Sequence, residues 1–249
     1  MAEPALALKG LAKSFGALKV TDGVDLSIAP GELHALIGPN GAGKTTLVHQ
    51  ISGTLRPDSG AILFGGTDIT HLPPQKRARA GLARTFQITS TIASLSALEN
   101  VALGVQAHSA HPLSLFRDAA RDEALNAPAW EALEAVGLTE RAHAPAGSLS
   151  HGEKRALEIA MALTLKPKLI LLDEPLAGVG HEEGERLIAL LKSLKGRFAM
   201  LLVEHDMSAV FALADRVTVL VYGGVIASGE PAAVRADPAV RQAYLGEEV

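Results

Sequence analysis

The sequence predicts an α/β fold in which a parallel sheet binds its ligand at the carboxyl ends of its strands. Three observations lead to this prediction. A glycine-rich loop joins an apolar run to a helical segment near residue 40, strands alternate with amphipathic helices after residue 163, and a segment rich in Ala, Leu and Glu separates these parts. With 249 residues, of which 48% are apolar, the chain can bury the core of one large domain.

The two halves of the predicted sheet lie on either side of a helical segment. Up to about residue 70, runs such as ALALKGLAKSF and ELHALIG are bounded by Gly and Pro and predict short β-strands, with one helix after the glycine-rich loop. Residues 88–163 carry Ala, Leu and Glu at helical spacing, as in SLSALENVALGV, and predict a helical subdomain.

Beyond residue 163 strands and helices alternate again. KLILLDE and FAMLLVEHD read as buried strands, SAVFALA as a helix, and RVTVLVYGGVIASG as an antiparallel pair of strands. The segment EEGERLIALLKSL predicts an amphipathic helix that shares one apolar face among Leu187, Ile188, Leu191 and Leu194.

Charge and composition narrow the classes of function. The formal net charge of −4 gives no global basic field to attract nucleic acid or an anionic membrane. The absence of Cys excludes disulfides, thiolate catalysis and Cys-based metal sites, and fits a reducing compartment. We expect no signal peptide, and no apolar run reaches the roughly 18 residues of a membrane span. If the protein works at a membrane, other chains should supply the spanning helices.

The glycine-rich loop matches the phosphate-binding pattern G-x-x-x-x-G-K-[ST]. Its residues are Gly38, Pro39, Asn40, Gly41, Ala42, Gly43, Lys44, Thr45 and Thr46. Its glycines let successive N–H groups turn toward phosphate oxygens, and the following helix offers its positive N-terminus. Lys44 would reach the β and γ phosphates, and the Thr45 hydroxyl would complete a Mg²⁺ shell. An ordinary glycine-rich turn would not require the full pattern between a strand and a helix, so the loop predicts nucleoside triphosphate binding. It does not specify the reaction, because kinases, GTPases and motor ATPases all use such a loop.

Two carboxylates end the strand in LILLDEP, at the edge where the sheet would meet the phosphates. Asp173 suits a magnesium shell, because a hard cation takes carboxylate and water oxygens. Glu174 could polarise an attacking water. The alternative is a strand that ends in solvated acids, which the phosphate loop in the same chain disfavours.

His205 ends the second buried strand, 32 residues after Asp173. That separation leaves room for one helix and one neighbouring strand, which would bring both residues to the same edge. A lone His is usually a surface or packed residue. Beside the other motifs, we expect His205 to hydrogen-bond the γ-phosphate and the attacking water.

The segment LSHGE opens another predicted helix with a capping box. Ser150 can accept from the N–H of Glu153 while the Glu153 carboxylate reaches back to the amide of residue 150. Capping does not explain Gly152, which weakens the first turn of a helix relative to Ala. Bare backbone at this position would allow another group, and in particular an anion, to approach closely.

With these motifs in order, nearly the whole chain resembles the ATP-binding-cassette (ABC) family, whose hallmark is a Leu-Ser-Gly-Gly-Gln signature between the phosphate loop and the Asp-Glu strand. The resemblance implies a RecA-like P-loop NTPase core, residues 1–87 and 164–230, with an N-terminal antiparallel β subdomain. It further implies an inserted α-helical subdomain over residues 88–163 that carries the signature, and a helical tail over residues 231–249. ATP and Mg²⁺ are the implied cofactors.

In that family two cassettes dock head to tail, and each signature binds the γ-phosphate held by the other's phosphate loop. The resemblance therefore implies that Ser150 and Gly152 complete an ATP site on a second copy or a paralogue. Phe15 matches the aromatic that stacks on adenine, and His205 matches the switch histidine. Gln87 matches the glutamine that links the nucleotide site, including its magnesium ion, to the helical subdomain.

Three residues depart from the family pattern. His151 replaces the first signature Gly and Glu153 replaces the signature Gln, so we expect Glu153 to cap the helix rather than touch phosphate. Gly180 stands where many members carry an Asp that communicates across the dimer, so this chain lacks the side chain that makes that contact in those members.

Within the family, the stretches ARTFQ, LENVALG, LAGVG, VEHDM and ADPAVRQAYLGEE resemble ATPase subunits of bacterial branched-chain amino acid importers and their urea and short-chain amide relatives. This implies transmembrane permease partners, an indirect link to a solute-binding protein, and a peripheral place on the cytoplasmic face of the inner membrane. The lipopolysaccharide-transport ATPase shares a similar tail, so an export role is one alternative. A scaffold cassette that binds ATP without turnover is another, and a P-loop kinase is a weaker one.

A basic stretch precedes Gln87. It carries Lys76, Arg77, Arg79 and Arg84. These side chains could contact acidic loops of a membrane partner or lipid, or simply form a solvated helix face. We expect no nucleic-acid binding, because no aromatic residues are interleaved with these basic side chains and the net charge of the chain is not positive.

Overall fold

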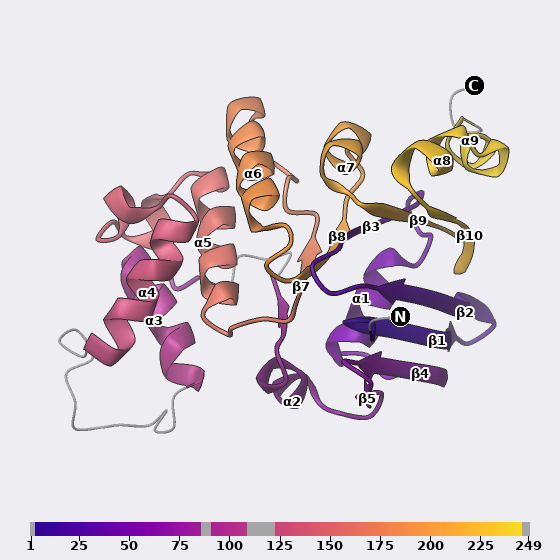
Figure 1. Ribbon diagram of the computed structural model, residues 1–249, viewed down its shortest axis with the longest axis horizontal. Helices are drawn as coiled ribbons and strands as arrows, with labels where there is room; N and C mark the ends of the chain where they lie inside the picture. The colour runs from indigo at the N-terminus through magenta and orange to yellow at the C-terminus, as the bar shows by residue number, and fades with distance from the viewer. Residues whose placement is uncertain (1–2, 86–90, 109–122, 246–249) are drawn as a thin grey trace.

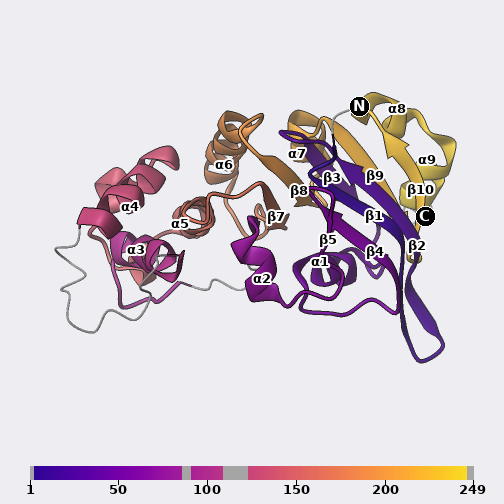
Figure 2. The same ribbon diagram turned by 60° about the horizontal axis from the view of Figure 1, so that its bottom comes forward.

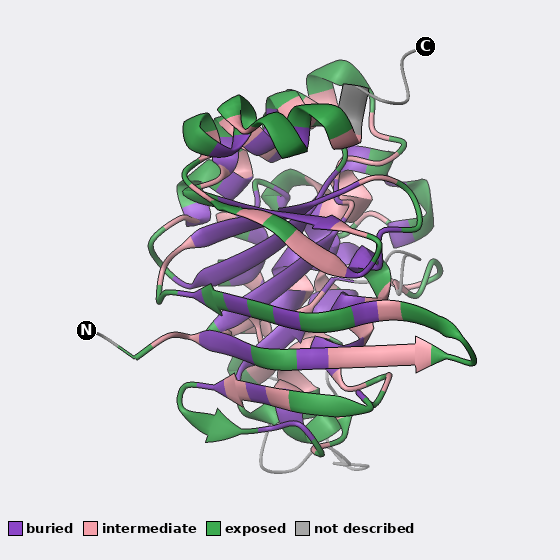
Figure 3. Ribbon diagram, turned by 90° about the vertical axis from the view of Figure 1, so that its right-hand side faces the viewer, coloured by how far each residue is buried: buried purple, intermediate pink, exposed green. Residues whose placement is uncertain are grey.

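The computed structural model describes residues 3–85, 91–108 and 123–245 and contains two sheets (Figure 1). The smaller sheet is antiparallel and comes from the N-terminal part of the chain. Its strands, in their order across the sheet, are β2 (Leu18–Ile28), β1 (Leu6–Phe15), β4 (Ser59–Phe64) and β5 (Thr67–Asp68). Buried and exposed residues alternate along the second half of β2, because one face packs on the core and the other meets solvent (Figure 3).

The larger sheet has six strands and is parallel except at one edge. Its strands, in order, are β10 (Gly224–Gly229), β9 (Arg216–Val221), β3 (Leu33–Ile37), β8 (Ala199–Val203), β7 (Leu169–Asp173) and β6 (Leu82–Arg84). Only β10 runs antiparallel to its neighbour. The predicted parallel sheet and the predicted antiparallel pair at residues 216–229 are therefore confirmed.

The helices of the described residues cover both faces of the larger sheet. They are α1 (Lys44–Ser52), α2 (Pro74–Arg79), α3 (Ala97–His108), α4 (Glu123–Ala135), α5 (His151–Leu163), α6 (His181–Leu194), α7 (Met207–Leu213), α8 (Pro231–Ala236) and α9 (Pro238–Leu245). In Figures 1 and 2, α3, α4 and α5 form a separate helical group at one end of the molecule. Across the described segments of the chain, no helix is long and apolar enough to cross a membrane.

The core divides along the period-two alternation of the central strands. On β7, Leu169 and Leu171 pack with α1 and the antiparallel sheet, whereas Ile170 and Leu172 pack with α5 and α6. Helix α1 is thus enclosed between the two sheets. On α6, Leu187, Leu191 and Leu194 are buried and Ile188 is partly buried, as the amphipathic pattern predicts. This packing fixes the carboxyl edge of the larger sheet beside the N-terminus of α1.

Candidate functional site

The phosphate-binding loop joins β3 to α1, as predicted, and two of its glycines have left-handed backbone angles. Gly41 has φ 79° and Gly43 has φ 103°. A Cβ on Gly43 would lie 2.2 Å from the carbonyl oxygen of Val20, so no larger residue fits there without displacing the backbone of β2. The loop geometry therefore depends on glycine at this position.

Lys44 lies inside this loop. Its side chain is almost fully buried, and its Nζ donates to the carbonyl oxygens of Gly38, at 2.6 Å, and Pro39, at 3.0 Å. Burial lowers the pKa of Lys44, and the nearby charges of Glu174 and Asp173 act in the opposite direction. The loop, the ammonium group and the two carboxylates thus share one site.

Sheet register brings Asp173 to the edge that bears the loop. Asp173, the last residue of β7, pairs with Val203 of β8, which in turn pairs with Leu36 of β3. The residue Asp173 is only 2% exposed. Glu174 follows at φ 47°, an unusual backbone angle for a residue with a side chain, of the kind that concentrates at functional sites.

Arg84 is the cation that neutralises Asp173 in this structure. Its Nη2 donates to Asp173 Oδ2 at 3.1 Å, and its Nη1 donates to the Ser52 hydroxyl at 3.3 Å. Arg84 comes from β6, the neighbour of β7 in the sheet. Sequence reasoning had grouped Arg84 with a basic stretch and missed this ion pair.

The basic stretch is not one surface. Arg77 is 1% exposed and donates to four carbonyl oxygens, two of which, those of Gln50 and Ile51, belong to the last turn of α1. It caps a helix that ends in a buried turn. Both interpretations of the stretch, a partner surface and a solvated helix face, are therefore wrong for Arg77 and Arg84, while Lys76 and Arg79 remain exposed.

The remaining predicted residues of the nucleotide site differ in position. Phe15 is 52% exposed at the end of β1, where its ring lies under the Lys13 ammonium at 5.6 Å from the ring centroid. His205 follows β8 at the same edge as Asp173, and its side chain is 66% exposed. Gln87 lies outside the described residues.

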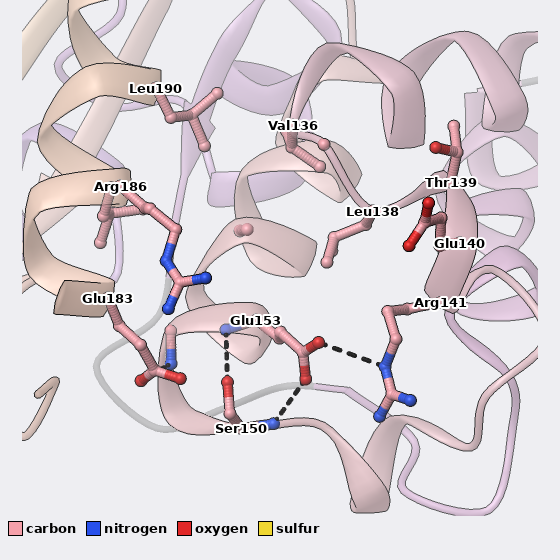
Figure 4. A pocket seen from close by; sticks show the side chains of 14 residues that line it. Val136, Leu138, Thr139, Glu140, Arg141, Ser150, Glu153, Glu183, Arg186 and Leu190 are labelled. Atoms are coloured by element: carbon pink, nitrogen blue, oxygen red, sulfur yellow. Dashed lines mark hydrogen bonds and ion pairs between the residues drawn. The ribbon is translucent and has the colours of Figure 1, made fainter.

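The N-terminus of α5 has the predicted capping box, shown in Figure 4. The Ser150 hydroxyl accepts from the Glu153 N–H at 3.2 Å, and Glu153 Oε2 accepts from the Ser150 N–H at 2.8 Å. Glu153 Oε1 also lies 3.2 Å from Arg141 Nε. Glu153 thus caps the helix, as expected.

Gly152 contacts a carboxylate of its own chain. Its N–H donates to Glu183 Oε2, on α6, at 3.0 Å, and a Cβ on Gly152 would lie 2.8 Å from the Glu183 Cβ. Hydrogen bonds from the Ser150 side chain and the Gly152 N–H lower the pKa of Glu183. The close approach predicted for Gly152 is therefore real, and its partner in this structure, which sequence reasoning missed, is an anion from α6.

A pocket of about 580 Å³ opens beside this contact (Figure 4). Its walls include Ser150, Gly152, Glu183, Arg141 and Arg186, and none of its lining residues belongs to the phosphate loop. Figures 1 and 2 show α5 on the opposite side of β7 from α1. A single chain therefore does not bring Ser150 and Gly152 to its own phosphate loop.

Sequence reasoning missed two further residues near the loop. His49, on α1, has a pKa lowered by burial and by the charge of Arg84. Glu204, immediately before His205, is 1% exposed. A charged residue after the five apolar residues of a strand was the only signal for Glu204, and the pairing that buries it is tertiary.

The donor set of the site fits a magnesium ion held largely by its substrate. Thr45 offers an exposed hydroxyl at the start of α1, and Asp173 offers a carboxylate oxygen already paired with a cation. In the part of the chain that the structure describes, no group of three or more His, Cys, Asp and Glu side chains could hold a metal. One carboxylate and one hydroxyl suit Mg²⁺, which keeps waters and takes phosphate oxygens as further ligands.

Two family models match the chain. The model described as ABC transporter matches residues 21–177, which include the phosphate loop, the capping box and the two carboxylates. The model described as branched-chain amino acid ATP-binding cassette transporter matches residues 225–249. The second match includes α8, α9 and all of β10 except its first residue.

Curated relatives are similar over nearly the whole chain. The high-affinity branched-chain amino acid transport ATP-binding protein BraF of Pseudomonas aeruginosa is 37% identical over 256 residues, which cover 99% of this chain and 100% of that protein. Its Escherichia coli counterpart LivG is 38% identical over 258 residues, with the same coverage.

Solved structures agree with the architecture. An ATP-binding cassette of an ABC transporter in its ADP conformation has a TM-score of 0.87 and 33% identity, covering 98% of this chain and 99% of that one. A dimeric post-hydrolysis cassette bound to ADP and phosphate has a TM-score of 0.77 and 26% identity, covering 91% and 98%. With its loop, its carboxylates and its capped α5 in the family's order, this chain belongs to the ABC transporter ATPases, in the branched-chain amino acid ATP-binding cassette subfamily.

Proposed function

We propose that this chain hydrolyses ATP to power the uptake of branched-chain or related amino acids or amides through separate permease chains. One observation carries the proposal: Lys44 in the phosphate loop shares a site with Asp173 and Glu174, in a chain 37–38% identical along its length to two branched-chain amino acid transport ATP-binding proteins. The match of residues 225–249 to the branched-chain cassette model favours import over lipopolysaccharide export.

ATP would bind along the phosphate loop and at the tip of the antiparallel sheet. Phe15, exposed at the end of β1, would stack on the adenine. The N–H groups of residues 38–46 would surround the phosphates, with Lys44 exchanging its carbonyl acceptors for phosphate oxygens. Such an exchange suits Lys44, because a buried ammonium gains from anionic partners.

Magnesium would be held by the Thr45 hydroxyl, the Asp173 carboxylate and Gln87, together with phosphate oxygens. When bound, Mg²⁺ neutralises charge that develops on the transferred phosphoryl group. Arg84 would lose Asp173 as its partner when the metal binds. In this structure the Arg84 guanidinium compensates the charge of the buried Asp173 carboxylate.

Hydrolysis would take place between the loops that follow β7 and β8. The Glu174 carboxylate would orient and polarise the attacking water, and the His205 imidazole would hydrogen-bond the water and the γ-phosphate. Gln87 would report the state of the nucleotide to the helical subdomain. Because both Lys44 and Glu174 are present, turnover is favoured over a scaffold role.

A second cassette would complete each ATP site. Ser150 and Gly152 would bind the γ-phosphate held by the partner's loop, because the N-terminus of α5 already attracts an anion. Glu183 would have to leave that position. His151 is exposed at the first turn of α5, so its side chain would face the partner. Gly180 would offer the partner no side chain.

These roles assign a function to each segment of the chain. Residues 1–87 and 164–230 would form the nucleotide-binding core, residues 88–163 the helical subdomain that moves against permease helices, and residues 231–249 a helical tail. The chain would lie on the cytoplasmic face of the inner membrane and receive its solute signal through the permeases from a solute-binding protein.

The test begins with partners. A tagged chain is purified from gently solubilised native membranes and its companions are identified by mass spectrometry. Two permease chains with a second, shorter cassette support the proposal, lipopolysaccharide-export components redirect it, and the chain alone in the cytosol overturns the transport role. Phosphate release by the recovered complex should disappear in Glu174→Gln, and the same variant should dimerise in saturating MgATP by light scattering.

A further inference from the structure

The side chain of Glu204 joins the two loops that carry the proposed catalytic groups. Glu204 Oε1 accepts from the Leu176 N–H at 2.9 Å, and Glu204 Oε2 accepts from the His205 N–H at 3.1 Å. Leu176 belongs to the loop that begins with Glu174, after β7, whereas His205 belongs to the loop after β8. One carboxylate thus spans both loops.

The position of Leu176 explains why a side chain is needed at this point. The Glu174 N–H is already bonded to the Val203 carbonyl oxygen, at 2.9 Å, and Pro175 has no N–H. The Leu176 amide is therefore the next donor after Glu174 by which the loop can be tied to β8. No backbone acceptor takes it among the described residues; the carboxylate of Glu204 does.

Burying an ionised carboxylate such as that of Glu204 costs free energy. Glu204 is 1% exposed and burial raises its pKa, while the N–H groups of Leu176, His205 and Asp206 and the charge of His205 act in the opposite direction. Its nearest cationic candidate, His205 Nδ1, lies 3.9 Å from Oε2. A residue that only filled the end of β8 could be apolar, as the five residues of the strand before it are.

We propose that Glu204 is a positioning residue for ATP hydrolysis, which holds the loop of Glu174 at a fixed separation from His205. The inference rests on the proposed roles of Glu174 and His205. Glu204 does not touch the nucleotide; it acts through the two loops that it joins. Its loss should therefore slow turnover without weakening ATP binding.

The test compares Glu204→Gln with the wild-type full chain in steady-state phosphate release. Gln has the same size but only one acceptor oxygen, so its NH₂ group must face the N–H of either Leu176 or His205. We expect kcat to fall about 10- to 100-fold, the effect of losing one charge-assisted hydrogen bond from the reacting geometry. The KM for ATP should change less than about threefold, because the phosphate loop is untouched.

Glu32→Gln is the matched control. It also removes one negative charge from a carboxylate that accepts a backbone amide, the Ala29 N–H at 2.8 Å, but Glu32 lies at the amino end of β3 (Leu33–Ile37), away from the edge that bears the site. Its kcat should stay close to that of the wild type. Hydrogen exchange of the Leu176 amide should accelerate in Glu204→Gln and not in the control. If Glu204→Gln folds poorly, Glu204→Asp keeps the charge but is one methylene too short to reach both amides, and the same losses are expected.

The outcomes separate this inference from the proposed function. If Glu174→Gln still hydrolyses ATP at the wild-type rate, the assigned role of Glu174 fails, and this inference fails with it. If Glu174→Gln is inactive while Glu204→Gln matches the wild type, only the positioning role is overturned. An equal loss in ATP binding and turnover would also overturn it, since that pattern indicates a structural defect. A double variant with His205→Ala should lose less than the product of the two single losses, because both changes act on the same geometry.

Discussion

Replacing Arg84 by Met should destabilise the chain in a way that magnesium and ATP together repair. The Asp173 side chain is 1% exposed, and its Oδ2 lies 3.1 Å from Arg84 Nη2. The substitution removes this guanidinium and leaves the buried carboxylate without its cation. Removing one partner of a buried ion pair typically costs about 3–5 kcal/mol. For a chain of this size that corresponds to a fall in Tm of about 6–20 °C.

The assay is a thermal melt without nucleotide, with ATP and EDTA, and with MgATP. In MgATP the metal gives Asp173 a cation again, so the difference in Tm between Arg84→Met and the wild type should shrink to a small part of its nucleotide-free value. ATP with EDTA should not produce this recovery, because the nucleotide alone adds negative charge beside the carboxylate. The comparison thus isolates the metal from the nucleotide.

Arg155→Met serves as the matched control. Arg155 Nη1 lies 3.0 Å from Glu158 Oε2 on α5, in a pair that is also largely buried but remote from the phosphate loop. Its loss of stability should be the same in all three conditions, apart from the general effect of ligand binding. If the Tm of Arg84→Met lies equally far below that of the wild type with and without MgATP, the metal does not replace Arg84 as the cation beside Asp173. The proposed role of Asp173 as a magnesium ligand then loses its support.

Four further outcomes are expected. Gly43→Ala should abolish nucleotide binding in a titration, since its Cβ would lie 2.2 Å from a backbone carbonyl oxygen. Arg77→Met should lower the free energy of unfolding by about 3 kcal/mol or more in urea, because four carbonyl oxygens lose a charged donor and, among the described residues, only that of Gln50 keeps another, the Gly53 N–H; a loss below 1 kcal/mol would contradict its capping role. Glu183→Gln in the Glu174→Gln background should dimerise at a lower MgATP concentration by light scattering, with Glu182→Gln as the unaffected control, because it weakens the anion that occupies α5. Hydrogen bonds and nearby positive charges lower the folded-state pKa of four carboxyl groups: Asp58, Asp68, Glu99 and Glu183. These groups stabilise the fold fully above their unfolded-state pKa values of about 3.8 (Asp) and 4.5 (Glu), and this stability is lost as the pH falls through their folded-state pKa values, so Tm should decline from pH 5 to pH 3.

Much of the site was predictable because its determinants are close in sequence. The loop of residues 38–46 forms between a strand and a helix as its glycines require, and the capping box of Ser150 and Glu153 closes over three residues. The alternation of strands and helices also predicted that Asp173 and His205 would meet one edge of a parallel sheet. These features follow from local conformational preference and from hydrophobic period, which a sequence displays directly.

The sequence by itself therefore determined the fold class, the phosphate loop, the strand that ends in two carboxylates and the capped start of α5. Only the tertiary structure decided which charges meet. Arg84 reaches Asp173 across 89 residues, Glu183 reaches Gly152 across 31, and Glu204 reaches Leu176 across 28. In the sequence, neither Glu183 nor Glu204 carries a sign of its partner, and nothing pairs Arg84 with Asp173. Packing of the strands and helices buries Asp173 and Glu204, and a buried charge is tolerated only where another segment supplies a hydrogen-bond donor.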